Sequence, residues 1–401
     1  MLQDVSVAEA RAAVLDGVRR LPAEPVALAD ARSRVLSADA AAAEPSPPFD
    51  TSAMDGYAVR AKDCAAPPLA LPVVGASVAG RAGVAAVAPG TAVAIATGAP
   101  LPTGADAVVP LEWTRREGDR VVIVQAPAPG HAIRPRGSAL ASGDVVLRAG
   151  RPLSPVALGV LSGLGLDPVD VVRRPRVRLV VTGDEVTRKP GPLAPGQIRD
   201  VNGPGLAAQI EFAGGVASVA YARDEPGEVA RAARGEWDAL VVTGGVSVGP
   251  RDRVREELGE AGAEWSLWRV RQRPGKPMLV GRWAGRPVLG LPGNPVSAAV
   301  CFEVYGRPLL RAMQGLPPTP VLLRAPLATP IAKPEGLTTF ARVNARRDAG
   351  GRLRLSSAGP QGSHVFRTLL ADGLAHLPPE WDEAPAGATV TYQPFAWTPP
   401  C

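Results

Sequence analysis

A glycine-rich loop of the 401-residue chain, Thr243-Gly244-Gly245-Val246-Ser247-Val248-Gly249, has the residue types that bind a phosphate group. Glycine permits positive φ and lets backbone N–H groups approach an anion closely, and the Ser247 hydroxyl adds a donor. The loop matches neither a P-loop nor a dinucleotide-binding fingerprint. A tight turn after the apolar run 239–242 would also explain the glycines, so the loop by itself indicates a phosphate site or a turn.

A second loop, Leu291-Pro292-Gly293-Asn294-Pro295-Val296-Ser297, has the pattern of a helix start. Asn294 is a natural N-cap, and Pro295 suits the first helical position. A helix N-terminus attracts negative charge, although capping alone explains the Asn-Pro pair. Just upstream, Arg273-Pro274-Gly275-Lys276-Pro277 supplies two cations on a loop that its prolines stiffen. The three loops together predict a site for a phosphorylated small molecule.

Carboxylates follow the ends of predicted strands and loops: Asp184, Glu185, Asp200, Asp224 and Asp252. Acidic groups in a site for anions are costly unless a cation lies between them, so they indicate Mg²⁺ binding or general-base catalysis. Helix capping is the alternative, and it suits Asp224 and Asp252 in particular.

The elements that must position these loops alternate between strand and helix from residue 176 onward. Strands are predicted at 177–181, 216–221 and 239–243, with helices near 203–213 and 226–234 between them. This order is typical of a doubly wound parallel sheet, in which ligands bind beyond the carboxyl ends of the strands. Further strands at 265–270, 278–280 and 287–289 precede a long helix over 295–313.

Sequence patterns in the rest of the chain predict three more domains. A capping box at Ser6 to Glu9 opens an amphipathic helix, and helical patterning that resumes near 155–164 indicates a split helical domain of residues 1–46 and 140–174. Short apolar runs over 47–139 predict an inserted β domain. The α/β domain then spans 175–316, and a Pro-rich linker introduces a C-terminal β domain, 317–401.

Composition narrows the class of protein. The net charge is +6, but only four lysines occur and the arginines are scattered, which argues against nucleic-acid binding. Three widely separated cysteines support neither a disulfide framework nor a zinc ribbon. The N-terminus lacks a signal peptide's apolar core, and no run is long enough for a membrane span. We therefore expect a cytoplasmic protein that contacts neither membrane nor nucleic acid.

The chain closely resembles the molybdopterin molybdenumtransferases, molybdenum-cofactor enzymes related to the C-terminal domain of gephyrin. Seven motifs in the same order carry the resemblance: Ser52-Ala53-Met54-Asp55-Gly56-Tyr57-Ala58, Thr97-Gly98-Ala99-Pro100, Thr182-Gly183-Asp184-Glu185, residues 243–249, Pro274-Gly275-Lys276-Pro277, residues 291–297 and Gly362-Ser363-His364. The resemblance implies an α/β multidomain fold with a molybdopterin-binding, doubly wound domain, a split helical domain, an inserted β domain and a C-terminal β domain.

The implied function is the insertion of molybdate into adenylylated molybdopterin, with Mg²⁺-dependent hydrolysis of the adenylyl phosphate bond and release of AMP. Such enzymes are homodimers in which Asp55 of one chain would face the α/β domain of the other, and a molybdopterin adenylyltransferase would act upstream. A non-catalytic or weakly active molybdopterin-binding scaffold is the alternative, because Ala139 replaces an acid that relatives carry. Arg273, where many relatives have lysine, keeps the charge but changes the donor geometry.

The resemblance also implies roles for individual residues. The pterin and its phosphate would be held by Thr243, Gly244, Gly245, Ser247, Gly249, Pro292, Gly293, Asn294 and Pro295. The molybdate pocket would be formed by Arg273, Lys276, Ser297, Arg342 and Ser363. The candidates for catalysis are Asp55, Thr97, Asp184, Glu185, Asp224 and Asp252, of which Asp184 and Asp252 would bind the metal.

Overall fold

The computed structural model describes residues 1–81, 86–247, 252–362 and 366–398, and the chain divides into two compact units. The first contains residues 1–37, 150–154 and 168–401, and the second contains residues 38–149 and 155–167. The four domain boundaries expected from the sequence remain a prediction. In the part of the chain that the structure describes, no helix has the length and apolar character needed to cross a membrane.

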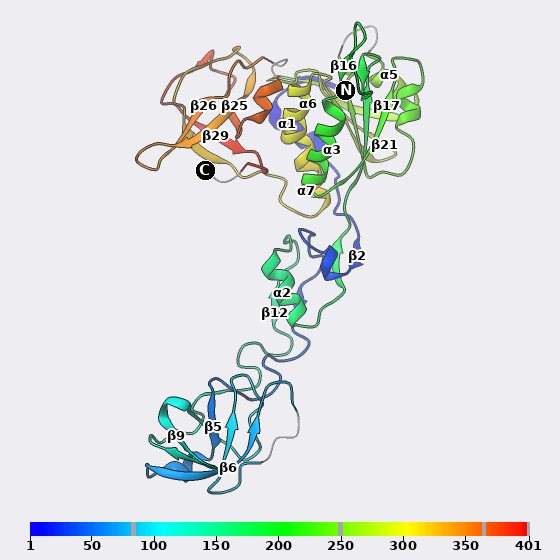
Figure 1. Cartoon of the computed structure of the whole chain (residues 1–401). Coiled ribbons are helices and arrows are strands. Elements are labelled where there is room, and N and C mark those ends of the chain that lie inside the picture. Colours follow the sequence, from blue (N-terminus) through cyan, green and yellow to red (C-terminus); the bar gives the residue numbers. More distant parts are fainter. Residues whose placement is uncertain (82–85, 248–251, 363–365, 399–401) are drawn as a thin grey trace. The chain divides into compact units, whose positions relative to one another are not determined.

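A seven-stranded sheet with helices on both faces forms the centre of the first unit (Figure 1). The doubly wound α/β fold expected from the sequence is thereby confirmed. The strand order is β1-β19-β21-β22-β18-β14-β17, and the four consecutive strands β22, β18, β14 and β17, of which β17 is an edge strand, run parallel. The bounds are β1 Leu2–Val5, β14 Arg176–Thr182, β17 Val216–Ala222, β18 Ala239–Thr243, β19 Ala263–Val270, β21 Leu279–Trp283 and β22 Arg286–Leu291.

Strand β21 departs from the parallel pattern, because it runs antiparallel to both of its neighbours. Between β21 and β22 lie only Ala284 and Gly285, which have φ of 49° and 74°. Two central residues at positive φ are the signature of a tight hairpin whose twist matches that of the strands. The two-residue connection therefore requires an antiparallel pair.

Alternate residues of the central strands face two different cores. Val177, Leu179 and Val181 of β14 pack in one cluster with α3 Asn202–Phe212, α6 Pro295–Cys301 and α7 Arg307–Met313. Val180 packs in a second cluster with α4 Glu228–Ala232 and α5 Val254–Glu260. Burial on both faces explains the nearly continuous apolar sequence of these strands.

The predicted capping box at Ser6 is confirmed, and it opens helix α1 Val7–Leu15. The Ser6 Oγ accepts from Glu9 N at 3.2 Å, while Glu9 Oε2 accepts from Ser6 N at 2.7 Å. Ala10 and Val14 of α1 pack in the same cluster as α6 and α7, and β1 pairs with β19. This first helix therefore covers the α/β sheet, and a short antiparallel pair, β2 Ala23–Val26 with β13 Val169–Val172, follows it.

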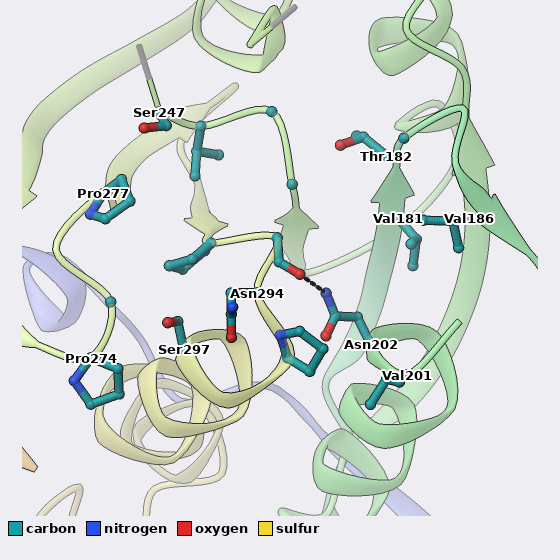
Figure 2. A pocket seen from close by; sticks show the side chains of 18 of the residues that line it. Val181, Thr182, Val186, Val201, Asn202, Ser247, Pro274, Pro277, Asn294 and Ser297 are labelled. Carbon is teal, nitrogen blue, oxygen red and sulfur yellow. Dashed lines mark hydrogen bonds between the residues drawn. The ribbon is translucent and has the colours of Figure 1, made fainter. Parts of the chain in front are cut away.

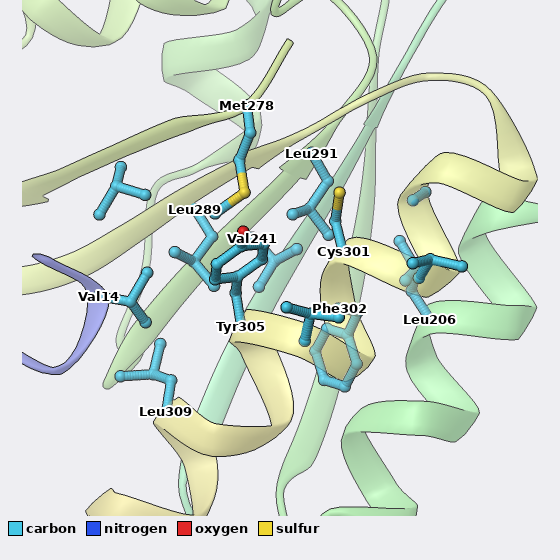
Figure 3. Packing of buried hydrophobic residues seen from close by; sticks show 14 of the residues in the cluster. Val14, Leu206, Val241, Met278, Leu289, Leu291, Cys301, Phe302, Tyr305 and Leu309 are labelled. Carbon is cyan, nitrogen blue, oxygen red and sulfur yellow. The ribbon is translucent and has the colours of Figure 1, made fainter. Parts of the chain in front are cut away.

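The long helix expected over 295–313 is interrupted by a π-helical turn, η4 Phe302–Gly306. Pro308 is the second residue after this turn, and it has no N–H to donate to the carbonyl of residue 304. The π turn puts Phe302 and Tyr305 into the main core, where Figure 3 shows the Tyr305 ring among apolar side chains such as Met278 and Leu289. Single π-helical turns within a longer helix often occur near functional sites.

A second sheet of the same unit has the order β20-β25-β27-β29-β23, with β26 beside β25. Its link to the α/β part is β20, whose residues Gln272 and Arg273 pair with Thr338 and Thr339 of β25. The bounds are β20 Gln272–Arg273, β23 Leu323–Pro326, β25 Thr338–Arg347, β26 Leu353–Ser357, β27 Gly373–Leu377 and β29 Thr389–Pro394; β24 Ile331–Ala332 pairs with β28 Glu383–Ala384, and β15 Val186–Thr187 with β16 Ile198–Arg199.

The second unit contains a six-stranded β sheet of order β8-β5-β7-β6-β10-β9 and helix α2 Pro155–Gly163. Its strands are β5 Gly56–Val59, β6 Leu69–Ser77, β7 Ala92–Ile95, β8 Ala107–Pro110, β9 Thr114–Glu117 and β10 Arg120–Ile123, with the short pairs β3 Ala40–Ala41 with β12 Val145–Leu147 and β4 Thr51–Ser52 with β11 Ile133–Arg134. Short strands were expected in this part of the chain.

We predict that His376 makes the first unit less stable in acid. The imidazole packs edge-on against Phe340 and lies 3.1 Å from Gln393 Oε1, and burial, reinforced by the charge of Arg11, lowers its pKa from 6.5 to about 4. Between these values the unfolded chain binds a proton that the folded chain does not, so unfolding becomes easier as the pH falls. The loss should reach roughly 3 kcal/mol.

The measurement is urea unfolding, followed by tryptophan fluorescence, at pH 6.5 and at pH 4. Because other groups also titrate, the wild type is compared with His376→Gln, whose amide does not. The variant should lose less free energy of unfolding over this interval than the wild type. Equal losses in the two proteins would show that His376 contributes nothing to acid sensitivity.

Candidate functional site

A cavity of about 600 Å³ lies at the carboxyl ends of β14, β18 and β22 (Figure 2). This is where doubly wound sheets bind their ligands. The cavity is lined by thirteen of the residues expected to form the site: Glu185, Asp224, Gly244, Gly245, Ser247, Asp252, Arg273, Lys276, Pro292, Gly293, Asn294, Pro295 and Ser297.

The other expected residues lie elsewhere. Thr243 is buried beneath the cavity, Asp184 faces a neighbouring hollow, and Arg342 is buried in β25. Asp55 and Thr97 belong to the second unit. Gly249 and Ser363 lie outside the described residues.

The two glycine loops contact each other backbone to backbone. Gly244 has φ of 91°, and a Cβ there would lie 2.4 Å from the Thr182 Oγ1. A Cβ on Gly293 would lie 3.3 Å from the Gly244 Cα. A side chain at Gly244 would clash with Thr182, and one at Gly293 would press against the Gly244 loop, so both glycines are required for this packing.

Asn202, which was not predicted, ties the two loops together. Its Nδ2 donates to Thr243 Oγ1 at 3.0 Å and to Gly293 O at 2.7 Å, and Figure 2 shows this side chain reaching from α3 toward the loop after β22. Thr243 Oγ1 in turn donates to Pro292 O at 2.9 Å. The only signal for Asn202 in the sequence is its position at the start of a helix, which capping would also explain.

The start of α6 closes one side of the cavity. Asn294 caps the helix as expected, because its Oδ1 accepts from Val296 N at 3.3 Å. Ser297, one turn into the helix, is buried but lines the cavity. The Ser297 hydroxyl is therefore the donor of this helix start that lies beside the ligand space.

Three cationic side chains gather at the junction of the α/β part and the C-terminal sheet. Lys276 Nζ lies 3.6 Å from Asp4 Oδ1, whereas no carboxylate of the described residues lies within ion-pair distance of Arg273 or Arg342. Arg342 is fully buried, its Nε donates to Thr368 Oγ1 and its Nη2 to Gly362 O, each at 3.2 Å, and its Nη1 has no partner among the described residues. Burial, and then the charge of Arg273, lower the pKa of Arg342 to about 10.

A buried charge without a counter-ion is costly, and a bound anion would offset that cost. Arg342 and Arg273 raise each other's electrostatic energy through like charge. This corner of the unit is therefore suited to an oxyanion.

The carboxylates divide between two hollows. Glu185, Asp224 and Asp252 line the main cavity, whereas Asp184 faces the neighbouring one and its Oδ1 accepts from Asp224 N at 3.2 Å. Within the described ranges, no three His, Cys, Asp or Glu side chains are grouped so as to hold a metal ion. Mg²⁺ commonly takes one or two carboxylates together with substrate phosphates, so the three cavity carboxylates fit an ion that arrives with a phosphorylated ligand.

Asp200, one of the carboxylates singled out in the sequence, also lines the cavity, and so does Gln272, which was not predicted. Asp200 Oδ2 accepts from the Tyr221 hydroxyl at 2.7 Å and Oδ1 accepts from Gly203 N at 2.8 Å. Burial and the Asp200 carboxylate raise the pKa of Tyr221 to about 12, so its hydroxyl remains a donor. These bonds hold the start of α3 beside the cavity.

In the second unit, Asp55 and Thr97 contact each other. Asp55 Oδ1 accepts from Thr97 N at 2.7 Å, and both residues are exposed. Gly56 follows in β5, where a Cβ would lie 2.0 Å from Val109 O. The two motifs thus form one ordered turn on this sheet.

Three family models together match most of the chain. They are the MoeA N-terminal region (domain I and II) over residues 5–165, a probable molybdopterin binding domain over 178–312 and the MoeA C-terminal region (domain IV) over 324–395. The order agrees with the sequence motifs.

Curated relatives and solved structures match over nearly the full length. Molybdopterin molybdenumtransferase 2 of Mycobacterium tuberculosis is 40% identical and covers 95% of this chain and 97% of the relative. Molybdopterin molybdenumtransferase of Haemophilus influenzae is 34% identical over 92% of this chain and 93% of its own. The crystal structure of the molybdopterin biosynthesis MoeA protein from Pyrococcus horikoshii superimposes with a TM-score of 0.84, at 28% identity, over 97% of this chain and 98% of that one.

We predict that the buried charge of Arg342 contributes to anion binding but not to the stability of the fold. Replacing it by methionine in Arg342→Met removes a desolvated charge that has no acidic partner in the described chain, so the melting temperature should not fall. Binding of molybdate, measured by calorimetric titration, should weaken about 100-fold through loss of a buried positive charge beside Arg273.

The control is Arg34→Met in the same unit. Arg34 is also buried, but it pairs with Glu24 at 2.5 Å and donates to Val172 O at 3.0 Å, so its loss removes an ion pair and a buried hydrogen bond and should lower the melting temperature without affecting molybdate binding. Destabilisation of Arg342→Met with unchanged molybdate binding would contradict the assignment.

Proposed function

The chain belongs to the molybdopterin molybdenumtransferase family, and from this premise we propose that it inserts molybdate into adenylylated molybdopterin and releases AMP. One observation carries the proposal. A single cavity joins a glycine loop suited to phosphate with Arg273 and Lys276 of the cationic corner, which is suited to a tetrahedral dianion.

The glycine loop would bind the molybdopterin end of the substrate. The Gly245 N–H and the Ser247 hydroxyl would contact its phosphate, with Gly293 and Asn294 alongside, whereas the Gly244 N–H already donates to Leu291 O at 3.1 Å. Because Asn202 fixes both loops, this half of the site is organised before the substrate arrives.

The cationic corner would bind molybdate as the second substrate. Arg273, Lys276 and Arg342 would neutralise the dianion, and Ser297 would donate its hydroxyl. Ser363, outside the described residues, stays a proposed fifth contact.

The cavity carboxylates would serve the hydrolysis of the adenylyl phosphate bond. Asp252, Asp224 and Glu185 would hold Mg²⁺ through one or two oxygens and accept a proton from the attacking water. Mg²⁺, when bound, would neutralise charge on the phosphate oxygens. Asp184 would act through Asp224, because its carboxylate holds the Asp224 N–H and faces the neighbouring hollow.

We further propose a cytoplasmic homodimer that receives its substrate from a molybdopterin adenylyltransferase. In the dimer, Asp55 and Thr97 of one chain would face the α/β domain of the other. The exposed Met54 and the bond between Asp55 and Thr97 N support a preformed contact surface on this turn. The scaffold alternative has no such support: Ala139, its motivating residue, is exposed and simply bonds Ser46 O through its N–H.

The proposed function predicts molybdate-dependent release of AMP. Purified protein is incubated with adenylylated molybdopterin and Mg²⁺, with and without molybdate, and AMP is quantified by chromatography. Substrate binding without any molybdate-dependent AMP would contradict the proposal and indicate a binding protein.

Within the same assay, Asp252→Ala should lower AMP release about 100-fold or more, the scale expected for loss of a general base or metal ligand. Substrate affinity should change little, since the glycine loop is untouched. Glu264→Ala, an exposed acid of β19 outside the cavity, is the matched control. Wild-type turnover in Asp252→Ala would remove this residue from the mechanism.

A further inference from the structure

Gln272 is a buried amide that none of the steps above uses. It is 1% exposed and lies in β20, directly before Arg273. Its Nε2 donates to Pro274 O at 3.2 Å and to Gly275 O at 3.1 Å, and lies 3.3 Å from Cys301 Sγ. One side chain thus binds the main chain of the loop that carries Arg273 and Lys276.

Tyr305 fixes the orientation of that amide. Its hydroxyl donates to Gln272 Oε1, which can only accept. Tyr305 is fully buried in the π turn, and burial raises the pKa of its hydroxyl well above the usual value, so it stays protonated. The hydrogen bond keeps the NH₂ group toward the loop carbonyls and prevents the amide from flipping.

The loop has no room to move toward α6. Gly275 has φ of 87°, and a Cβ there would lie 2.2 Å from Cys301 Sγ and 3.1 Å from Gln272 Nε2. The loop is also anchored at both ends: Arg273 pairs with Thr339 of β25, and Lys276 O accepts from Val270 N at 3.0 Å. Gln272 fills the space that these anchors enclose.

We propose that Gln272, oriented by Tyr305, is a positioning residue that holds Arg273 and Lys276 in the geometry that binds the oxyanion substrate. The inference rests on the proposed function, because it assigns these two cations to molybdate. Both side chains are long, and a fixed backbone reduces the freedom that they lose on binding. Removing the clamp should therefore weaken molybdate binding and leave the phosphate loop unaffected.

A purely structural role for Gln272 is the competing explanation, and Gln314 separates the two. Gln314 is a buried glutamine of the same unit, and its Nε2 donates to Ala213 O and Leu310 O, both at 2.8 Å. It does not contact the cationic loop. Gln314→Leu therefore removes comparable hydrogen bonds without loosening the molybdate corner.

The experiment compares wild type, Gln272→Leu, Tyr305→Phe and Gln314→Leu by molybdate titration calorimetry and by AMP release. In Gln272→Leu we expect the Kd and KM for molybdate to rise about 10-fold, with kcat and the KM for adenylylated molybdopterin nearly unchanged. In Tyr305→Phe, which loses only a hydroxyl, the Kd and KM for molybdate should rise about threefold. This variant replaces Gln272→Leu in the test if Gln272→Leu does not fold. Gln314→Leu should lose thermal stability but keep the wild-type KM for molybdate.

Equal molybdate affinity in all four proteins would overturn the role of Gln272. Wild type that binds molybdate without releasing AMP would contradict the proposed function, while the titrations would still decide whether Gln272 positions the loop. Wild type that binds no molybdate would overturn both.

Discussion

The burial of Arg342 without an acidic partner in the described chain is the constraint around which the rest of this unit is arranged. A guanidinium group loses its hydration on burial, and here Arg273 adds like charge instead of relieving it. The fold compensates with strand pairing, because Arg342 lies within the ten-residue strand β25 between β26 and β27. The remaining electrostatic cost is what a bound dianion would remove, so ligand binding and stability are coupled at this point.

The same strand links the cationic corner to the phosphate loops. Pairing of β20 with β25 places Arg273 next to the C-terminal sheet, and the loop that follows packs against Cys301 of α6. The glycine loops beside the N-terminus of α6 contact each other backbone to backbone, and Asn202 holds them together through hydrogen bonds to Thr243 Oγ1 and Gly293 O. Two anion sites of different character thus share one cavity because a short strand pair and one helix start fix both.

Much of this architecture follows from local sequence patterns. Apolar runs alternating with helical periods predicted the doubly wound sheet, and Ser6 and Asn294 predicted their helix starts, because each signal acts within a few residues. The strand β21 was expected at 278–280, but its antiparallel direction was not, since that direction depends on an Ala284-Gly285 turn whose positive φ values are not evident from composition.

The sequence predicted which loops form the site, but it did not predict which side chains contact one another there. Asp184 and Glu185 are adjacent in sequence, yet their side chains face different hollows, since neighbouring residues rarely point the same way. Asn202 and Gln272 act on carbonyls 91 and two residues away, and nothing in the sequence states which carbonyl lies opposite an amide. Such roles depend on tertiary packing and need coordinates.

The central claim is that the cationic corner is the molybdate site. Its most direct test is a crystal of the protein soaked in molybdate, with the molybdenum located by its anomalous scattering. An anomalous peak is expected within hydrogen-bonding distance of Arg273, Lys276 and Ser297, which line the cavity, with the buried Arg342 adding its charge beside Arg273. A peak confined to another part of the cavity, or none at saturating molybdate, would contradict it.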